Sequence, residues 1–168
     1  MTRLQYLREL RIQALKESSP DLPYPDSFVR PYTDKTANAL TKAIIDWVKF
    51  AMNGQAERIS VTGRAIDKTK IVTDCLGHQV RIGSVQWIPP SMTKGSADVS
   101  ATIRGRSVKI EVKIGHDRQS DAQRKYQQEV ERSGGIYLIA RNFDQFVSDL
   151  NAKLCVEQSE LFSDACAR

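Results

Sequence analysis

The strongest constraint on the fold of this chain is the segment from Val108 to Ile114, in which apolar and charged residues alternate strictly. An alternation with a period of two is typical of a β-strand, whose successive side chains point to opposite faces of a sheet. One face would be apolar and the other charged (Val108, Ile110, Val112 and Ile114 against Lys109, Glu111 and Lys113). The segment therefore predicts a strand with a buried face, and with a carboxylate and an ammonium group one pleat apart on the other face.

A second carboxylate, Asp98, precedes this strand and is separated from it by a turn signal at Arg104 and Gly105. If the chain reverses there with a loop of two or four residues, the antiparallel register places Asp98 directly opposite Glu111. Their Cβ atoms would then lie about 4.5–5.5 Å apart on one face. Opposed like charges destabilise a sheet, and a bridging cation removes the conflict. The pair therefore predicts a binding site for a divalent cation.

The residues that follow predict a helix and a further strand. Ser120 and Gln123 form a capping-box pattern that would start a helix reaching about Arg132. The apolar run 136–140 comes after two glycines and is typical of a buried strand that is parallel to its neighbour.

These motifs together resemble the PD-(D/E)XK nuclease superfamily, and within it the small stand-alone VRR-NUC-like nucleases of phage and bacterial genomes. The matching residues are Lys94-Gly95-Ser96-Ala97-Asp98, Glu111-Val112-Lys113, Gln119-Ser120, Gln123-Arg124-Lys125-Tyr126 and Gly134-Gly135-Ile136-Tyr137. The resemblance implies an α/β, restriction-endonuclease-like fold, in which helices flank a mixed β-sheet. It also implies a divalent-metal-dependent nuclease that hydrolyses DNA phosphodiester bonds, with Mg²⁺ as the cofactor and Mn²⁺ as its substitute.

The same resemblance assigns roles to individual residues. Asp98, Glu111 and the carbonyl of Val112 would bind the metal ion, and Gln123 would belong to the active site. Lys113 would lie beside the attacking water or the phosphate, where it could orient the water, accept its proton or stabilise developing charge. Many family members carry an acidic residue on the first helix of the domain, but here the facing position is Asn38, which offers no charge to a second metal ion.

Four further residues are candidate nucleic-acid contacts. They are Arg58, Arg64, Arg104 and Ser120. For each arginine the alternative is a solvated surface charge. For Ser120 the alternative is a plain helix N-cap, although a helix N-terminus would also suit a nearby phosphate.

We expect three regions along the chain. Residues 1–33 form an amphipathic helix (2–16) and a proline-rich linker, residues 34–153 form the nuclease-like domain, and residues 154–168 form a tail. Within the domain, Thr33 or Asp34 would cap a helix that ends near residue 53. Strands would follow at 58–61, at 70–73 and at either 79–82 or 85–88, with a last helix from Asn142 to about residue 153.

Composition narrows the class of protein. Hydrophobic content of 40% with 27% charged residues is typical of a soluble globular chain, and the absence of an apolar run of about 18 residues or of a signal peptide predicts a cytoplasmic protein without a membrane segment. The net charge of +5 favours a polyanion such as DNA. No helix-turn-helix or zinc-finger pattern is present, so cutting would be structure-selective or partner-directed.

Two other readings stay open at this point. The chain could be a catalytically silent nucleic-acid-binding module on the same fold, or a partner-binding α/β domain that uses its leucine-striped N-terminal helix as an interface. The oligomeric state stays open as well: a symmetric homodimer would allow a nuclease to make two cuts on opposite strands.

Overall fold

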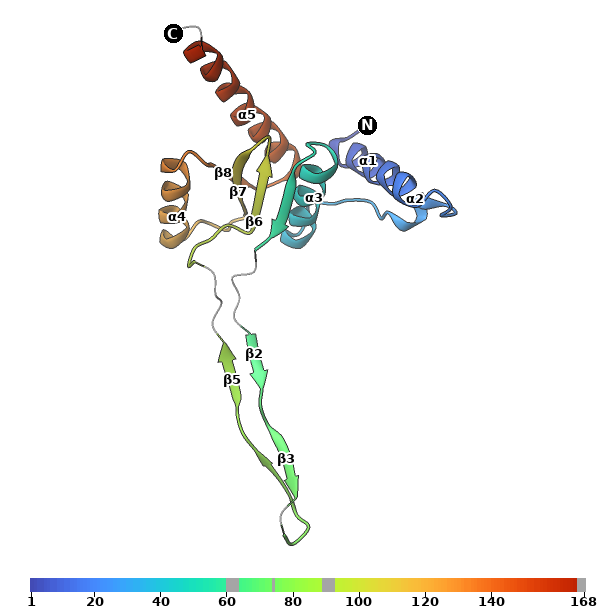
Figure 1. Cartoon of the computed structure of the whole chain (residues 1–168), viewed down its shortest axis with the longest axis vertical. Coiled ribbons are helices and arrows are strands. Elements are labelled where there is room, and N and C mark those ends of the chain that lie inside the picture. The colour runs from blue at the N-terminus through green and yellow to red at the C-terminus, as the bar shows by residue number, and fades with distance from the viewer. Residues whose placement is uncertain (60–63, 74, 89–92, 166–168) are drawn as a thin grey trace. The chain divides into compact units, whose positions relative to one another are not determined.

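The computed structural model describes residues 1–59, 64–73, 75–88 and 93–165, and within them the chain is mixed α/β, with five helices and a mixed β-sheet (Figure 1). The α/β class predicted from the sequence is confirmed. Two compact units form, one from Met1–Ile59 with Gly95–Arg168 and the other from Ser60–Lys94. They are described separately below.

The first unit is built on a four-stranded sheet with the strand order β1-β6-β7-β8. The strands are β1 (Gln55–Arg58), β6 (Val99–Ile103), β7 (Arg106–Val112) and β8 (Ile136–Ala140). The pairs β1–β6 and β6–β7 are antiparallel, and β7–β8 is parallel. A parallel neighbour needs a crossover connection, which helix α4 (Asp121–Arg132) supplies. The strand expected at 136–140 and its parallel pairing are confirmed.

The hairpin between β6 and β7 has a two-residue loop. Ile103 pairs with Arg106, and the intervening Arg104 and Gly105 have φ angles of 51° and 78°. Positive φ at both loop positions is the signature of a type I′ turn, whose twist matches the twist of the flanking strands. The register places Val99 opposite Ile110. The predicted reversal at this turn and the predicted register are therefore confirmed.

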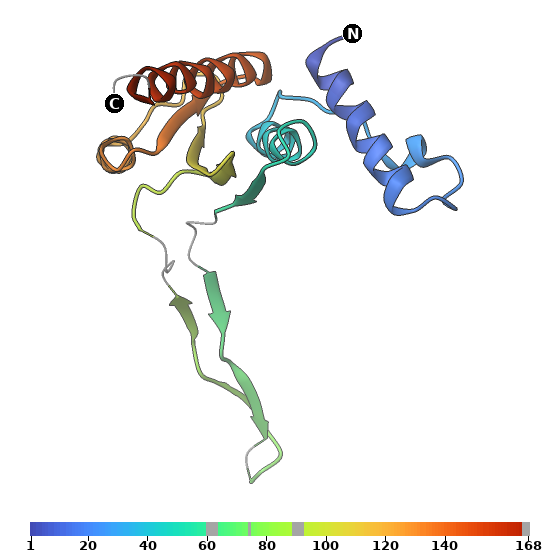
Figure 2. The same cartoon turned by 45° about the horizontal axis from the view of Figure 1, so that its top comes forward.

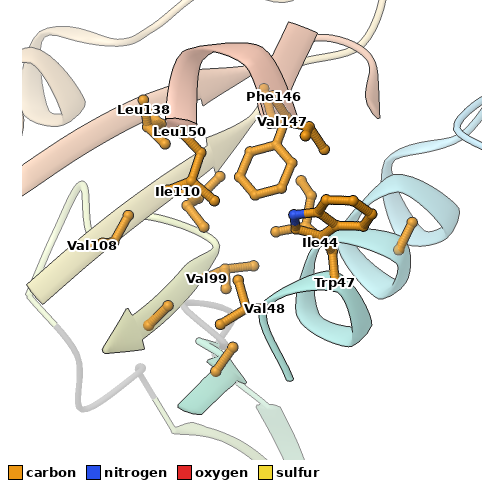
Figure 3. Packing of buried hydrophobic residues seen from close by; sticks show 14 of the residues in the cluster. Ile44, Trp47, Val48, Val99, Val108, Ile110, Leu138, Phe146, Val147 and Leu150 are labelled. Carbon is orange, nitrogen blue, oxygen red and sulfur yellow. The ribbon is translucent and has the colours of Figure 1, made fainter. Parts of the chain in front are cut away.

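Helices cover both faces of the sheet. Helix α3 (Ala37–Phe50) and α4 lie on opposite sides of β6 and β7 (Figures 1 and 2), and α5 (Phe143–Ala165) packs on β8. The core fills the space between the sheet, α3 and α5 (Figure 3). Within it, the rings of Trp47 and Phe143 meet edge to face, with their centroids 5.5 Å apart. The apolar side chains of the alternating strand, Val108, Ile110 and Val112, point into this core, as predicted.

The N-terminal segment belongs to the same unit. Helix α1 (Arg3–Ser18) buries Leu7 completely in the core, and Arg11 forms an ion pair with Asp46 of α3 at 2.7 Å. Between them the chain forms the short helix α2 (Pro25–Phe28), where the sequence predicted only an extended linker. The N-terminal helix thus packs on its own chain through Leu7.

Several predicted boundaries are wrong. Thr36, and neither Thr33 nor Asp34, caps α3. Asp34 Oδ2 instead accepts a hydrogen bond from the Phe143 backbone N–H at 3.1 Å. The first strand ends at Arg58, and residues 60–61 of the predicted strand lie outside the described part of the chain. Helix α5 continues through Ala165 instead of ending near residue 153. Leu154, 6% exposed, extends the buried side of this helix beyond the predicted end.

The second unit is an antiparallel two-stranded ribbon. It comprises β2 (Arg64–Asp67), β3 (Lys70–Thr73), β4 (Gln79–Ile82) and β5 (Val85–Ile88), with β2 paired to β5 and β3 to β4 (Figure 1). The Lys68 N–H donates to the Ser84 carbonyl at 3.2 Å between the two pairs. Beside it, Gly83 has a φ of +101°, and a Cβ atom there would lie 2.5 Å from the Lys68 carbonyl oxygen. The strand predicted at 70–73 is confirmed, and both of the alternatives for its successor are strands.

Candidate functional site

Asp98, Glu111 and Lys113 lie at one end of the sheet, on the face opposite the core. Val99 pairs with Ile110, and both side chains are buried in the core. The residue before Val99 and the residue after Ile110 therefore point to the other face. Lys113 shares that face because it lies two residues beyond Glu111, and its Nζ is 3.0 Å from Glu111 Oε1. The structure thus brings together the three residues that the sequence singled out.

The first turn of α4 fixes the orientation of the Glu111 carboxylate. Ser120 Oγ accepts a hydrogen bond from the Gln123 N–H at 3.3 Å, and Gln123 Oε1 accepts one from the Ser120 N–H at 2.9 Å. The predicted capping box is confirmed, and Ser120 is the N-cap. The remaining end of the Gln123 amide, Nε2, donates to Glu111 Oε1 at 2.5 Å. A single glutamine therefore stabilises the helix start and holds the carboxylate.

Lys113 lies between two carboxylates. Besides Glu111, its Nζ contacts Asp117 Oδ2 at 3.4 Å. The side chains of Lys113 and Glu111 are 8% and 2% exposed, whereas that of Asp117 is 59% exposed, so this second partner borders solvent. Sequence reasoning missed Asp117 because it follows β7 in a loop, where strand alternation predicts no direction for a side chain.

The backbone holds Asp98 in position. Its Oδ2 accepts a hydrogen bond from the Val112 N–H at 2.9 Å, so this carboxylate takes the place of a strand partner at the end of β7. Strand geometry directs the carbonyl of Val112 to the same side as its N–H. Upstream, Gly95 has a φ of +87°, and a Cβ atom there would lie 2.5 Å from the carbonyl group of Ala122 in α4. The segment that leads to Asp98 therefore packs directly against the helix that carries Gln123.

Burial and neighbouring charges shift the protonation of the central pair. Burial raises the pKa of Glu111 above its ordinary value, the hydrogen bond and charge of Lys113 lower it, and repulsion from Asp98 raises it further. Burial by itself would lower the pKa of Lys113, but the hydrogen bonds and charges of Glu111 and Asp117 outweigh burial and raise it. Lys113 is therefore a cation at neutral pH.

One oxygen of Glu111 has no hydrogen-bond partner among the described residues. Its Oε2 is buried and accepts no hydrogen bond from them, whereas Oε1 accepts two. A buried carboxylate oxygen without a partner is costly and calls for compensation by a ligand or an ion. The described residues contain no group of three or more His, Cys, Asp or Glu side chains that could hold a metal ion. The oxygen donors at this end of the sheet are instead the side chains of Asp98 and Glu111 and the carbonyl of Val112, a set that suits Mg²⁺, which keeps several waters.

The predicted arginine contacts do not join this group. Arg58 pairs with Val99 and so points to the core side of the sheet, where it donates to Asn38 Oδ1 at 2.9 Å. Arg104 lies in the hairpin turn at the other end of β6, six residues from Asp98 and so roughly 20 Å away at about 3.4 Å per residue. Arg64 belongs to the ribbon, and its side chain lies outside the described part of the structure.

Tyr137, which the sequence analysis matched to the superfamily without giving it a role, also lies near the site. It pairs with Lys109 on β7, which places it on the same face as Glu111. Its ring packs edge to face with Tyr126 of α4 at 6.4 Å, and burial and the charge of Glu111 raise the pKa of its hydroxyl. Lys109 itself donates from Nζ to Ser100 Oγ at 2.6 Å. The sequence did contain a signal for this placement, namely a tyrosine within the apolar run 136–140. A buried tyrosine hydroxyl usually needs a polar neighbour, so its presence in a buried strand indicates nearby polar groups.

Comparison of the chain with protein-family models and with curated proteins finds no match. The resemblance to a nuclease superfamily therefore depends on the residues and motifs themselves. None of the helices that the structure describes is long and apolar enough to cross a lipid bilayer.

Proposed function

We propose that this chain is a divalent-metal-dependent nuclease that hydrolyses phosphodiester bonds of DNA. The observation that carries the proposal is the buried Glu111 carboxylate, which has one oxygen without a partner, faces Asp98 and is bonded to Lys113. A buried acid placed beside a second acid is unfavourable unless a cation joins them. Two carboxylates and an ammonium group at one spot suit a cation together with an anionic substrate.

The arrangement of the sheet supports a restriction-endonuclease-like fold as part of this proposal. Glu111 lies on β7, and Asp98 directly precedes β6, the antiparallel neighbour of β7. The next strand, β8, is parallel to β7. Helices pack on both faces of the sheet, with α4 on the side of the two acids. The motifs that resemble the superfamily thus come from consecutive elements of one layered α/β unit.

Mg²⁺ would be held by the side chains of Asp98 and Glu111 and by the carbonyl of Val112. When bound, such an ion lowers the pKa of a coordinated water and stabilises negative charge on a phosphoryl oxygen. Mn²⁺ would substitute because it accepts the same oxygen ligands.

The residues of the chain supply positioning and charge. Lys113, held as a cation between Glu111 and Asp117, would donate a hydrogen bond to the scissile phosphate and stabilise charge that develops there. This role fits the raised pKa of Lys113 better than proton abstraction does. Gln123 would keep the Glu111 carboxylate oriented through its hydrogen bond, which is a positioning role.

The test is a cleavage assay with purified full-length protein on linear, nicked and branched DNA, in the presence of Mg²⁺ or Mn²⁺. Wild type should cut at least one substrate, and EDTA should abolish cutting. Glu111→Gln and Lys113→Met should each lower the rate by at least about a thousandfold, a loss typical of removing a metal ligand or a charge-stabilising group.

Lys109→Met is the matched control. Lys109 of β7 lies on the same face as Lys113, which directly follows the strand, but its Nζ bonds Ser100 rather than a carboxylate. The rate should therefore stay within about threefold of wild type. Absence of cleavage of every substrate with either metal, or full activity of Glu111→Gln, would overturn the proposal.

A catalytically silent DNA-binding module is the second candidate. One observation favours it: Asp98 and Glu111 already accept hydrogen bonds from Val112, Lys113 and Gln123 within the chain. Salt-dependent DNA binding without turnover, together with a melting temperature that Ca²⁺ and Mn²⁺ leave unchanged, would identify this second function.

A further inference from the structure

The ribbon formed by β2, β3, β4 and β5 exposes apolar side chains to an unusual degree. Among the described residues, it holds seven of the twelve exposed large hydrophobic side chains. They are Ile71, Val72, Leu76, Val80, Ile82, Val85 and Trp87, which are 44–78% exposed. Clusters of exposed apolar residues on one element mark binding surfaces more often than isolated ones do.

The ribbon cannot cover these side chains by itself. Each pair has two strands only, so every strand has an edge without a strand partner within the described residues. An isolated two-stranded hairpin is marginally stable in water, because it has neither a third strand nor a helix on which to bury a face. A partner that lies along the ribbon would provide that cover.

The charge of the ribbon indicates the chemistry of the partner. Residues 60–94 carry five basic and two acidic residues, a net of +3, out of +5 for the whole chain of 168 residues. In the β3–β4 pair, Lys70 lies on one face and Arg81 on the other, and neither strand contains an acidic residue. Lys68, in the break between the two pairs, is exposed.

We propose that the ribbon binds duplex DNA by lying in its major groove. The choice of DNA rests on the proposed nuclease function. The major groove is about 12 Å wide and admits a two-stranded β-ribbon. Lys68, Lys70 and Arg81 would contact phosphates, while the methyl groups of Val and Ile side chains would contact thymine methyls and sugars.

Charge and groove shape separate this partner from two rivals. A second copy of the chain would bring Lys70 or Arg81 of one ribbon near the same cation of the other, with no acidic residue in β3 or β4 to compensate. Duplex RNA has a deep, narrow major groove that side chains do not enter. B-form DNA therefore fits the ribbon better than either.

The experiment measures equilibrium binding of full-length protein to a labelled DNA duplex in EDTA, over a range of salt concentrations, by fluorescence anisotropy. The triple variant Lys68→Gln, Lys70→Gln, Arg81→Gln should bind at least about tenfold more weakly. Loss of three phosphate contacts should reduce the slope of log K against log salt by up to about 2.7. The matched control, Lys16→Gln, Lys125→Gln, Arg132→Gln, removes three exposed charges from the other unit and should bind within about threefold of wild type.

A shortened ribbon provides a second variant. Deletion of residues 70–82 with Thr69→Asn joins an Asn-Gly turn between Lys68 and Ser84, which already pair. This variant should also lose binding, while the far-UV and near-UV circular dichroism of the remaining unit persists. A duplex RNA of the same sequence should bind wild type more weakly than the DNA does.

Three outcomes would each overturn the inference. The ribbon variants could bind DNA as tightly as wild type, or wild type could bind duplex RNA as tightly as DNA. The third outcome is a dimer that the deletion converts to a monomer without any loss of DNA binding. Because binding is measured in EDTA, its outcome is independent of cleavage. A ribbon that binds DNA in a protein that never cuts it would defeat the proposed function alone, and an active nuclease indifferent to the ribbon variants would defeat this inference alone.

Discussion

The four-stranded sheet and the ribbon use similar residues and reach opposite outcomes. Both contain antiparallel pairs rich in Val and Ile, yet Ile110 of β7 is fully buried, whereas Ile71 and Ile82 of the ribbon are 63% and 52% exposed. The difference lies in what covers the strands. Helices α3 and α5 pack on one side of the sheet, whereas the described residues of the ribbon include no helix or further strand that covers it. Strand-forming residues therefore specify a strand, but burial depends on a neighbouring layer.

Folded proteins ordinarily expose charged side chains and bury apolar ones, and each of the two regions breaks one half of this rule. The sheet buries charge, at Glu111 and Lys113, while the ribbon exposes apolar side chains. Each departure is costly in the isolated chain, since a buried carboxylate and an exposed apolar surface both gain from a ligand. If both proposals hold, the sheet carries the chemistry and the ribbon the binding.

The largest expected effect separates chemistry from binding. Glu111→Gln should reduce metal-dependent cleavage by at least about a thousandfold and leave DNA affinity in EDTA within about threefold. Shortening the ribbon should have the opposite effect. The affinity for DNA should fall, while the single-turnover cleavage rate at saturating DNA should be largely retained. Single-turnover kinetics together with anisotropy measure both quantities, and a variant that lost cleavage and affinity equally would break the division between the two regions.

The next effect concerns stability. Ile110→Ala should lower the free energy of unfolding by about 2–5 kcal/mol, because it leaves a cavity in a packed core. Ile71→Ala, in the ribbon, should change it by no more than about 0.5 kcal/mol. Urea unfolding in a Trp87→Phe background leaves Trp47, which is 8% exposed in the core, as the only tryptophan reporter. Equal losses for the two alanine variants would show that the ribbon is covered in solution.

Two glycines with matching geometry allow a finer comparison. Gly95 and Gly83 both have positive φ, and at both a Cβ atom would lie 2.5 Å from a backbone atom. Gly95→Ala should cost about 1–3 kcal/mol of global stability through backbone strain, whereas Gly83→Ala should raise hydrogen exchange only within the ribbon. Gly105 has a positive φ but open space around it. Gly105→Ala therefore measures the cost of the positive φ alone, and it should lower the free energy of unfolding by about 1–2 kcal/mol. Native-state hydrogen exchange distinguishes local from global opening.

The smallest effect is a pH dependence of the sheet unit. Burial raises the pKa of Glu111 in the folded state, so the folded protein binds this proton more tightly than the unfolded chain does. The contribution of Glu111 to stability is therefore largest below its unfolded pKa and is lost as pH rises through the raised folded pKa. In EDTA, the free energy of unfolding of wild type relative to Glu111→Gln should fall over that window. A difference that stays constant with pH would mean that the carboxylate is not desolvated in solution.

Local patterns predicted the elements around the candidate site well. The alternation in β7 predicted which side chains face the core, and the turn at Arg104 and Gly105 predicted the register that brings Asp98 opposite Glu111. The capping box at Ser120 and Gln123 is confirmed. Each of these features depends on residues close together in the sequence, so short-range geometry suffices to predict them.

Contacts between distant segments were not predictable in the same way. Asp34 was one of two residues expected to cap the helix that follows it, and it instead accepts a hydrogen bond at the start of α5, more than a hundred residues away. The contact of Asp117 with Lys113 and the packing of Tyr137 on Tyr126 depend on a loop and on a helix whose placement the local sequence does not specify.

The sequence by itself determined the alternating strand at 108–112, the hairpin register and the pairing of two acids with a lysine on one face, because a strand has a fixed period of two and a two-residue turn fixes alignment. The tertiary structure decided where β1 and β2 lie, which strands form the covered sheet and which form an uncovered ribbon. It also decided that Glu111 is buried with one oxygen that has no partner among the described residues. Burial and electrostatics depend on which layers pack together, and that packing joins residues far apart in the chain.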